Sequence, residues 1–167
     1  NFVISVGETT GNECLENRQM MRTIDITNER FPVGASTYTV PEASGNYCDR
    51  GGRFGSHSVN ENITPFYHLR LLFLTYFNAG VRAIDIRDPY NPKEVGHYIP
   101  AVTSKTQNRC IVQGAAQTCK IAIQTNNAEV DNRGYIYIVD RANTGMHILQ
   151  LTGPARQIAV GLPPLAN

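Results

Sequence analysis

Met21–Thr27 reads Met-Arg-Thr-Ile-Asp-Ile-Thr, and Val81–Arg87 repeats it as Val-Arg-Ala-Ile-Asp-Ile-Arg. A third, more divergent copy occupies Met146–Thr152. Each copy follows a short apolar segment and precedes a stretch that ends in proline, at Pro41, Pro100 and Pro163. A unit that recurs in series in this way is a supersecondary module that stacks on its neighbours. The repeat therefore predicts a repetitive architecture and no particular reaction.

The middle copy predicts antiparallel strands in series. The apolar and aromatic run Leu71–Phe77 is too short for a typical helix and is rich in strand formers. Asn78–Gly80 suits a tight turn before the alternating strand Val81–Ile86. A proline-containing turn then leads to a strand at Lys93–Ile99, and a fourth strand is expected upstream at His57–Glu61.

The other two copies fit the same frame. In the first copy, Phe2–Val6 matches Leu72–Tyr76, and we expect the strand that would precede it to be missing. The third copy predicts four strands, at Ala128–Asp131, Tyr135–Val139, Met146–Leu151 and Gln157–Val160.

The fold class that we expect is all-β, a β-propeller of four-stranded antiparallel blades. About three blades are present, at approximately residues 1–50, 51–118 and 119–167 of one propeller domain. A β-sandwich of short strands competes with it, and the wide loops Gly7–Gln19 and Ala101–Thr118 suit either architecture. Propellers typically close with about four to eight blades. We therefore expect the remaining blades as partners, from the same precursor or from a second chain.

Two stretches carry a resemblance to a known family. Tyr76–Ile86 with Asn91–Gly96, and Gly134–Arg141 with Thr144–Leu149, resemble LVIVD-repeat propeller proteins. Gly51–His57 is similar to the loop before a first strand in that group. The resemblance implies a propeller in a longer chain, from a family of largely secreted bacterial proteins with no assigned reaction. The sequence shows no complete catalytic constellation and repeats structural residues, so we expect a binding or assembly role.

Composition excludes several classes of partner. The chain has 15 Lys and Arg against 14 Asp and Glu, so no basic stripe favours nucleic acid or an anionic membrane. It contains no apolar run of the ~18 residues that a membrane span requires. A hydrophobic content of 41% with 17% charged residues is typical of a folded domain.

Four cysteines lie in predicted loops, and none forms a Cys-x-x-Cys pair. An even count in loops favours two disulfides over a metal site. Their neighbourhood in the sequence indicates the pairs Cys14–Cys48 and Cys110–Cys119. Disulfides would place the protein in an extracytoplasmic compartment, periplasmic or secreted. Free buried thiols in a reducing cytoplasm are the alternative.

Candidate site residues lie on the strands that would line a propeller channel. His57 and Glu61 share a face of one expected strand, and an imidazole with a carboxylate is a plausible ligand pair for a divalent metal such as copper. Asn127 and Glu129 occupy the comparable stretch of the third repeat, and Arg53, in a Gly-rich loop, is a candidate anion contact at the rim. The alternative is a polar, water-lined channel in which His57 is only hydrogen-bonded.

A second resemblance bears on His57. Gly55–His57 is similar to the Pro-His-Asp step of selenium-binding proteins, which are propellers with a copper-dependent methanethiol oxidase activity. Here serine replaces the proline, and Ser58 replaces the aspartate. The resemblance implies that His57 binds metal and that the protein is a small-molecule oxidoreductase, which is our alternative to the binding role.

Aspartate and arginine recur inside the repeated strand itself, as Asp25 and Asp85 with Arg22 and Arg82. A catalytic carboxylate is not normally repeated from blade to blade. We expect these residues to be structural, with each aspartate accepting hydrogen bonds from backbone or arginine, and with the arginines paired to aspartates of neighbouring blades.

Overall fold

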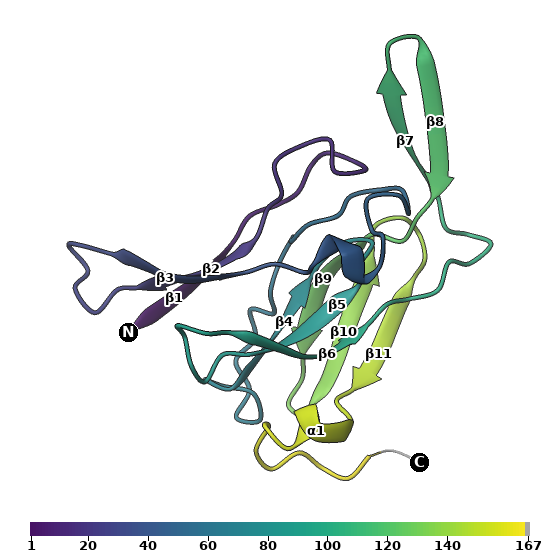
Figure 1. The fold of residues 1–167 in the computed structure, drawn as a ribbon. Helices are drawn as coiled ribbons and strands as arrows, with labels where there is room; N and C mark the ends of the chain where they lie inside the picture. Colours follow the sequence, from purple (N-terminus) through teal and green to yellow (C-terminus); the bar gives the residue numbers. More distant parts are fainter. Residues whose placement is uncertain (166–167) are drawn as a thin grey trace.

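The computed structural model describes residues 1–165, which form an all-β fold of small antiparallel sheets (Figure 1). Three sheets have three strands each, in the orders β1-β2-β3, β4-β5-β6 and β11-β10-β9, and β7 pairs with β8 in a hairpin. The strands are β1 (Phe2–Val6), β2 (Met21–Asp25), β3 (Val33–Tyr38), β4 (Leu71–Thr75), β5 (Val81–Asp85), β6 (Lys93–Tyr98), β7 (Asn108–Gln113), β8 (Ala116–Ile121), β9 (Thr125–Val130), β10 (Tyr135–Asp140) and β11 (Met146–Gln150). A 3-10 turn, η1 (Glu42–Ser44), and one short helix, α1 (Gly153–Arg156), complete the described elements.

The sequence repeat is also a structural repeat. Met21 lies opposite Tyr38 in the first sheet, and Val81 lies opposite Tyr98 in the second. Both ladders shift register at the same step, after Thr23 in β2 and after Ala83 in β5. Because a bulge of this kind bends and twists the strand, the two sheets share their local shape as well as their pairing.

The strand predicted at His57–Glu61 forms only in part. Val59 makes an isolated bridge to Leu74, and His57 N donates to the Thr75 carbonyl at 3.0 Å. Further along, the Asn60 side chain accepts the Phe73 N–H at 2.8 Å. A side chain thus takes the place of a backbone acceptor, which ends the ladder there.

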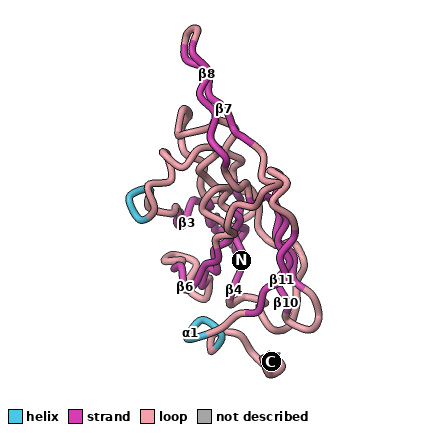
Figure 2. Tube along the Cα trace, turned by 90° about the vertical axis from the view of Figure 1, so that its right-hand side faces the viewer, coloured by secondary structure: helices cyan, strands magenta, loops and turns pink. Residues whose placement is uncertain are grey.

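Two predictions about elements are wrong. Gln157–Val160 is not a strand, because Gly153 adopts a φ of +59° and Pro154 occupies the first turn of α1, where its fixed φ favours a helix. The segment predicted as the loop Ala101–Thr118 contains β7 and the start of β8. Gly114, at φ +62°, turns this hairpin, which projects from one end of the molecule in both views (Figures 1 and 2).

Both predicted disulfides are confirmed. Cys14–Cys48 joins the loop after β1 to the loop after η1, and Cys110–Cys119 joins β7 to β8, where the two residues are direct neighbours across the ladder. The cysteines of the second pair therefore lie in strands, not in the loop that was predicted. Two disulfides suggest an oxidising, extracytoplasmic environment.

The core lies on both faces of β4. Leu71 and Phe73 belong to an apolar cluster shared with β9, β10 and α1. Leu72 and Leu74 belong to a second cluster, shared with β2 and with Val40 and Tyr47 on either side of η1. Successive side chains of a strand point to opposite faces, so an unbroken apolar run is what burial on both faces requires. Complete burial of each such side chain contributes about 1.5–3 kcal/mol.

Candidate functional site

A single carboxylate oxygen of Glu8, in the first repeat, contacts side chains from the other two repeats. Glu8, just after β1, lies with its Oε1 2.9 Å from Arg53 Nη1 and 3.3 Å from Arg141 Nη1. His57 Nε2 is 3.7 Å from the same oxygen. Arg53 and His57 belong to the second repeat, and Arg141 follows β10 in the third. We call these four residues the Glu8 cluster.

The Gly-rich loop positions Arg53 through its backbone. Gly51 and Gly52 have φ values of +84° and +68°, and a Cβ on Gly52 would lie 2.4 Å from Gln124 Nε2. Arg53 N donates to Gln124 Oε1 at 3.0 Å, and its Nη1 also donates to the Thr9 carbonyl. Only glycine fits this combination of φ and close approach, which explains the composition of the loop.

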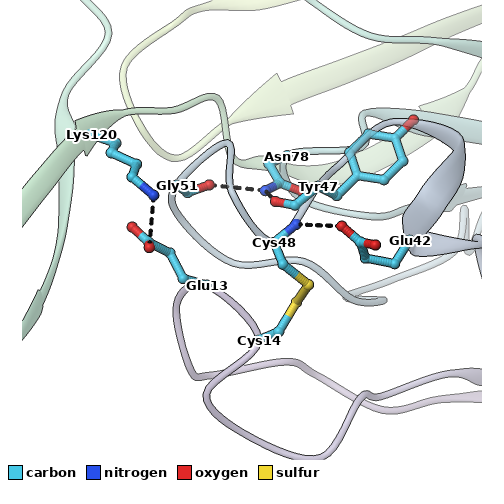
Figure 3. The surroundings of a disulfide bond; sticks show 8 residues. All are labelled: Glu13, Cys14, Glu42, Tyr47, Cys48, Gly51, Asn78 and Lys120. Atoms are coloured by element: carbon cyan, nitrogen blue, oxygen red, sulfur yellow. Dashed lines mark hydrogen bonds and ion pairs between the residues drawn. A yellow bond between two sulfur atoms is a disulfide. The ribbon is translucent and has the colours of Figure 1, made fainter.

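The Cys14–Cys48 disulfide lies just before the Gly-rich loop and links it to the loop after β1 (Figure 3). Asn78 Nδ2, which is buried, donates to the carbonyls of Tyr47 and Gly51 at 2.8 and 2.9 Å. Because these contacts tie the loop to the turn after β4, the backbone that carries Arg53 is fixed to the core.

His57 is held with one nitrogen facing the cluster and the other buried. Its ring packs edge-on against Phe77, with centroids 5.2 Å apart, and Nδ1 is buried. Burial lowers the pKa of His57 below its ordinary value, although the Glu8 carboxylate acts in the opposite direction. Burial therefore favours the neutral form of the imidazole.

The other predicted site residues lie elsewhere. Glu61 is exposed, and no contact joins it to His57 in the part of the chain that the structure describes. Glu129 Oε2 accepts the Asn62 N–H at 3.3 Å, and Asn127 is hydrogen-bonded to the Asn126 amide. The structure thus brings Arg53 and His57 together with Glu8, and it places Glu129 in a separate contact.

The repeated aspartates cap turns. Asp25 Oδ1 accepts the Thr27 N–H at 2.8 Å, and Asp85 Oδ1 accepts the Arg87 N–H at 3.0 Å. The Arg87 guanidinium also donates to the Asp85 carboxylate. These hydrogen bonds lower the pKa of the Asp85 carboxyl. The expected pairing with Arg82 is wrong, because Arg82 binds Glu94 instead, and Arg22 is exposed.

A polar pocket of 330 Å³ adjoins the Glu8 cluster. Arg53 and Arg141 line it together with Arg109 from β7, and no carboxylate is among its lining residues. Amide side chains complete the wall, from Asn12, Gln107 and the buried Gln124.

Sequence reasoning missed Glu8, Arg109 and Arg141, because each comes from a different segment and meets the others only through the tertiary fold. The Gly-Gly-Arg loop and His57 were the sequence signals that pointed to this place.

Residues 1–165 contain no group of three or more His, Cys, Asp or Glu side chains arranged to hold a metal ion. The prediction of a metal at His57 stays a prediction. No helix within the same residues is long and apolar enough to cross a membrane. The chain matches no known family, and no curated protein is similar to it.

Proposed function

We propose that this chain is part of an extracytoplasmic β-propeller, similar to LVIVD-repeat proteins, with a binding role centred on the Glu8 cluster. The observation that carries the proposal is the contact of one Glu8 oxygen with residues of all three repeats. Repeat proteins build binding surfaces where equivalent loops of successive modules converge. A polar pocket beside such a point of convergence supplies a place for a ligand.

Three further observations support the propeller. The first two sheets share one register and one bulge, as successive blades would. The middle sheet buries both faces of β4 between neighbouring repeats. The segment at His57–Asn60 lies against β4 in the position of an innermost strand, and Ser58 Oγ donates to the Asn126 carbonyl of β9 at 3.0 Å. The remaining blades would come from the same precursor or from a second chain.

The proposal is tested by electron cryomicroscopy of the intact protein that contains this chain. We expect blades arranged round an axis, with Glu8, Arg53 and Arg141 facing the axial opening. A face-to-face sandwich would overturn the architecture. A ring in which other segments cover the Glu8 cluster would overturn the binding role at this place.

The alternative is a metal-dependent oxidoreductase, and it is favoured by one observation, the imidazole of His57 beside the Glu8 carboxylate, with Nε2 3.7 Å from Oε1. Plasma mass spectrometry of the intact protein separates the two functions. The binding role predicts no stoichiometric transition metal. About one copper per chain, lost in a folded His57→Ala variant, would replace the binding role with the oxidoreductase.

A further inference from the structure

Three arginines and no carboxylate are among the residues that line the pocket beside the Glu8 cluster. Arg53 and Arg141 share the single Oε1 of Glu8. Arg109 makes one side-chain hydrogen bond within the described residues, from Nη2 to the Arg141 carbonyl at 2.9 Å, and that partner is neutral. A guanidinium carries five N–H donors in a fixed fork, so Arg109 retains donors for a ligand.

Two other carboxylates, Asp140 and Glu16, lie near these arginines and act on them through charge, but their hydrogen bonds go to neutral groups. Asp140 accepts the backbone N–H groups of Gln124, Ala142 and Thr144. Glu16 accepts from the Thr10 hydroxyl at 2.6 Å and from the Thr10 N–H. Burial, followed by the positive charge of Arg141, lowers the pKa of Arg109; Asp140 acts in the opposite direction, and Arg53 adds to the lowering. An anion entering the pocket would relieve this repulsion.

The protein's own Glu8 shows which anion suits these arginines. Its carboxylate already accepts from two guanidinium groups, and planar carboxylates match the arginine fork. The pocket volume of 330 Å³ lies at the small end of ligand sites, and its walls are polar. A small hydrophilic acid fits this volume and lining better than a lipid or an aromatic ligand.

Arg109 is held in place before any ligand arrives. It is adjacent to Cys110, whose disulfide to Cys119 joins β7 and β8. Lys120 Nζ is 2.9 Å from Glu13 Oε2 (Figure 3). Asn12 Nδ2 donates to the Cys110 carbonyl at 2.9 Å, so both strands of the hairpin are anchored at their base. A site fixed in this way loses little conformational entropy when it binds.

We infer that this pocket binds a small organic carboxylate, with Arg109 and Arg141 as its principal contacts and Glu8 as an internal competitor for Arg53 and Arg141. The inference rests on the binding role proposed above and names the ligand class for that site.

Isothermal titration of the intact protein with succinate, inorganic phosphate and sulfate, at constant ionic strength, tests the inference. Saturable binding of succinate is expected, tighter than that of phosphate or sulfate. Arg109→Gln should weaken it by about tenfold or more, as expected for loss of a charge-assisted hydrogen bond. Glu8→Gln should strengthen it, because a competing carboxylate is removed.

Arg87→Gln is the matched control, since Arg87 is bound to Asp85 at the far end of β5 and should leave the affinity unchanged. Circular dichroism establishes that each variant is folded. Equal affinities of Arg109→Gln and Arg87→Gln, weaker binding by Glu8→Gln, tighter binding of phosphate or sulfate, or no binding by the folded protein would each overturn the inference.

Failure of the carboxylate site differs from failure of the proposed function. If succinate does not bind while cryomicroscopy finds the Glu8 cluster open at the axis, only the ligand class is wrong. If other segments cover the cluster, both are wrong.

Discussion

The buried Arg82 guanidinium, with 3% of its side chain exposed, donates from Nη1 to Glu94 Oε1 at 3.1 Å. Its Nη2 donates to the Tyr47 hydroxyl at 2.8 Å. The second oxygen of Glu94 accepts the hydroxyl of Tyr38, which lies on β3 of the preceding sheet. Burial alone would raise the pKa of Glu94, but Tyr38 and Arg82 outweigh it, and the net shift is downward. The ion pair lies within the second repeat, and its hydrogen bonds with Tyr38 and Tyr47 join that repeat to the first.

Glu94→Gln should destabilise the fold by about 3 kcal/mol, because it leaves the Arg82 charge buried without a counter-ion. The free energy of unfolding is measured by urea titration. The matched control is Arg22→Gln at the equivalent position of the first repeat, where the arginine is exposed and Gly34 stands in place of the glutamate. This control should change stability by less than about 0.5 kcal/mol. Equal effects of the two variants would contradict the structural role of the pair.

Arg82 and Arg22 show which features of the fold could be predicted from the sequence. The repeated alternation in β2 and β5 predicted these strands and their common frame, because period-two patterning is a local property. The partner of Arg82 was not predictable in the same way. The partner depends on a residue across the ladder, which is Glu94 in the second repeat and Gly34 in the first. It also depends on which face of the sheet the neighbouring repeat covers.

Local chemistry also explains the elements that were missed. Gln157–Val160 has a strand-like composition, but Gly153 and Pro154 start a helical turn just before it. The β7–β8 hairpin was read as a loop, although Gly114 lies between two segments of matched length that each carry a cysteine. Glu8, Arg109 and Arg141 share no sequence pattern, so only the tertiary fold brings them to one pocket.

His57 should titrate below its ordinary pKa of 6.5, because burial disfavours the charged imidazole. Since the folded pKa is lower than the unfolded one, this group's contribution to stability is complete above pH 6.5 and is lost as the pH falls through the folded value. Glu8→Gln should lower the His57 pKa further, because the Glu8 carboxylate favours the charged form. Two-dimensional NMR of the imidazole protons measures both values.

Glu129→Gln is the control for this titration, since Glu129 contacts Asn62 and not His57. A His57 pKa above 6.5, falling to the ordinary value in Glu8→Gln, would contradict the prediction. It would mean that His57 and Glu8 form a charged pair.

The two disulfides should differ in how much each contributes to stability and to ligand binding. Replacing Cys14 and Cys48 by serine opens a loop spanned by a sequence separation of 34, against 9 for Cys110 and Cys119. The chain-entropy relation gives losses of about 4 and about 2.7 kcal/mol respectively. The shorter bridge should matter more for ligand binding, because it fixes the strand that carries Arg109.

Urea titration and succinate titration of the two double-serine variants measure these effects separately. Contrary evidence would be a larger loss of stability in the Cys110 and Cys119 variant, together with unchanged succinate affinity.

Gly52 and Gly114 form a matched pair for the Gly-rich loop, because both have φ values near the left-handed region, at +68° and +62°. An added Cβ at Gly114 would meet nothing within 4 Å, whereas at Gly52 it would lie 2.4 Å from Gln124 Nε2 and 3.1 Å from the Ala122 Cβ. Gln124 is buried and accepts the Arg53 N–H, so it has little room to move.

Gly114→Ala should therefore cost only the backbone strain, about 1–2 kcal/mol. Gly52→Ala should cost a further 1–3 kcal/mol or so from overpacking, and it should displace Arg53 from Glu8. Urea titration measures the loss of stability in each variant. The His57 pKa reports the displacement of Arg53, because Arg53 opposes the charging of that ring. If the two alanine variants were equally stable and left the His57 pKa unchanged, the close approach of Gly52 to Gln124 would not be what positions Arg53.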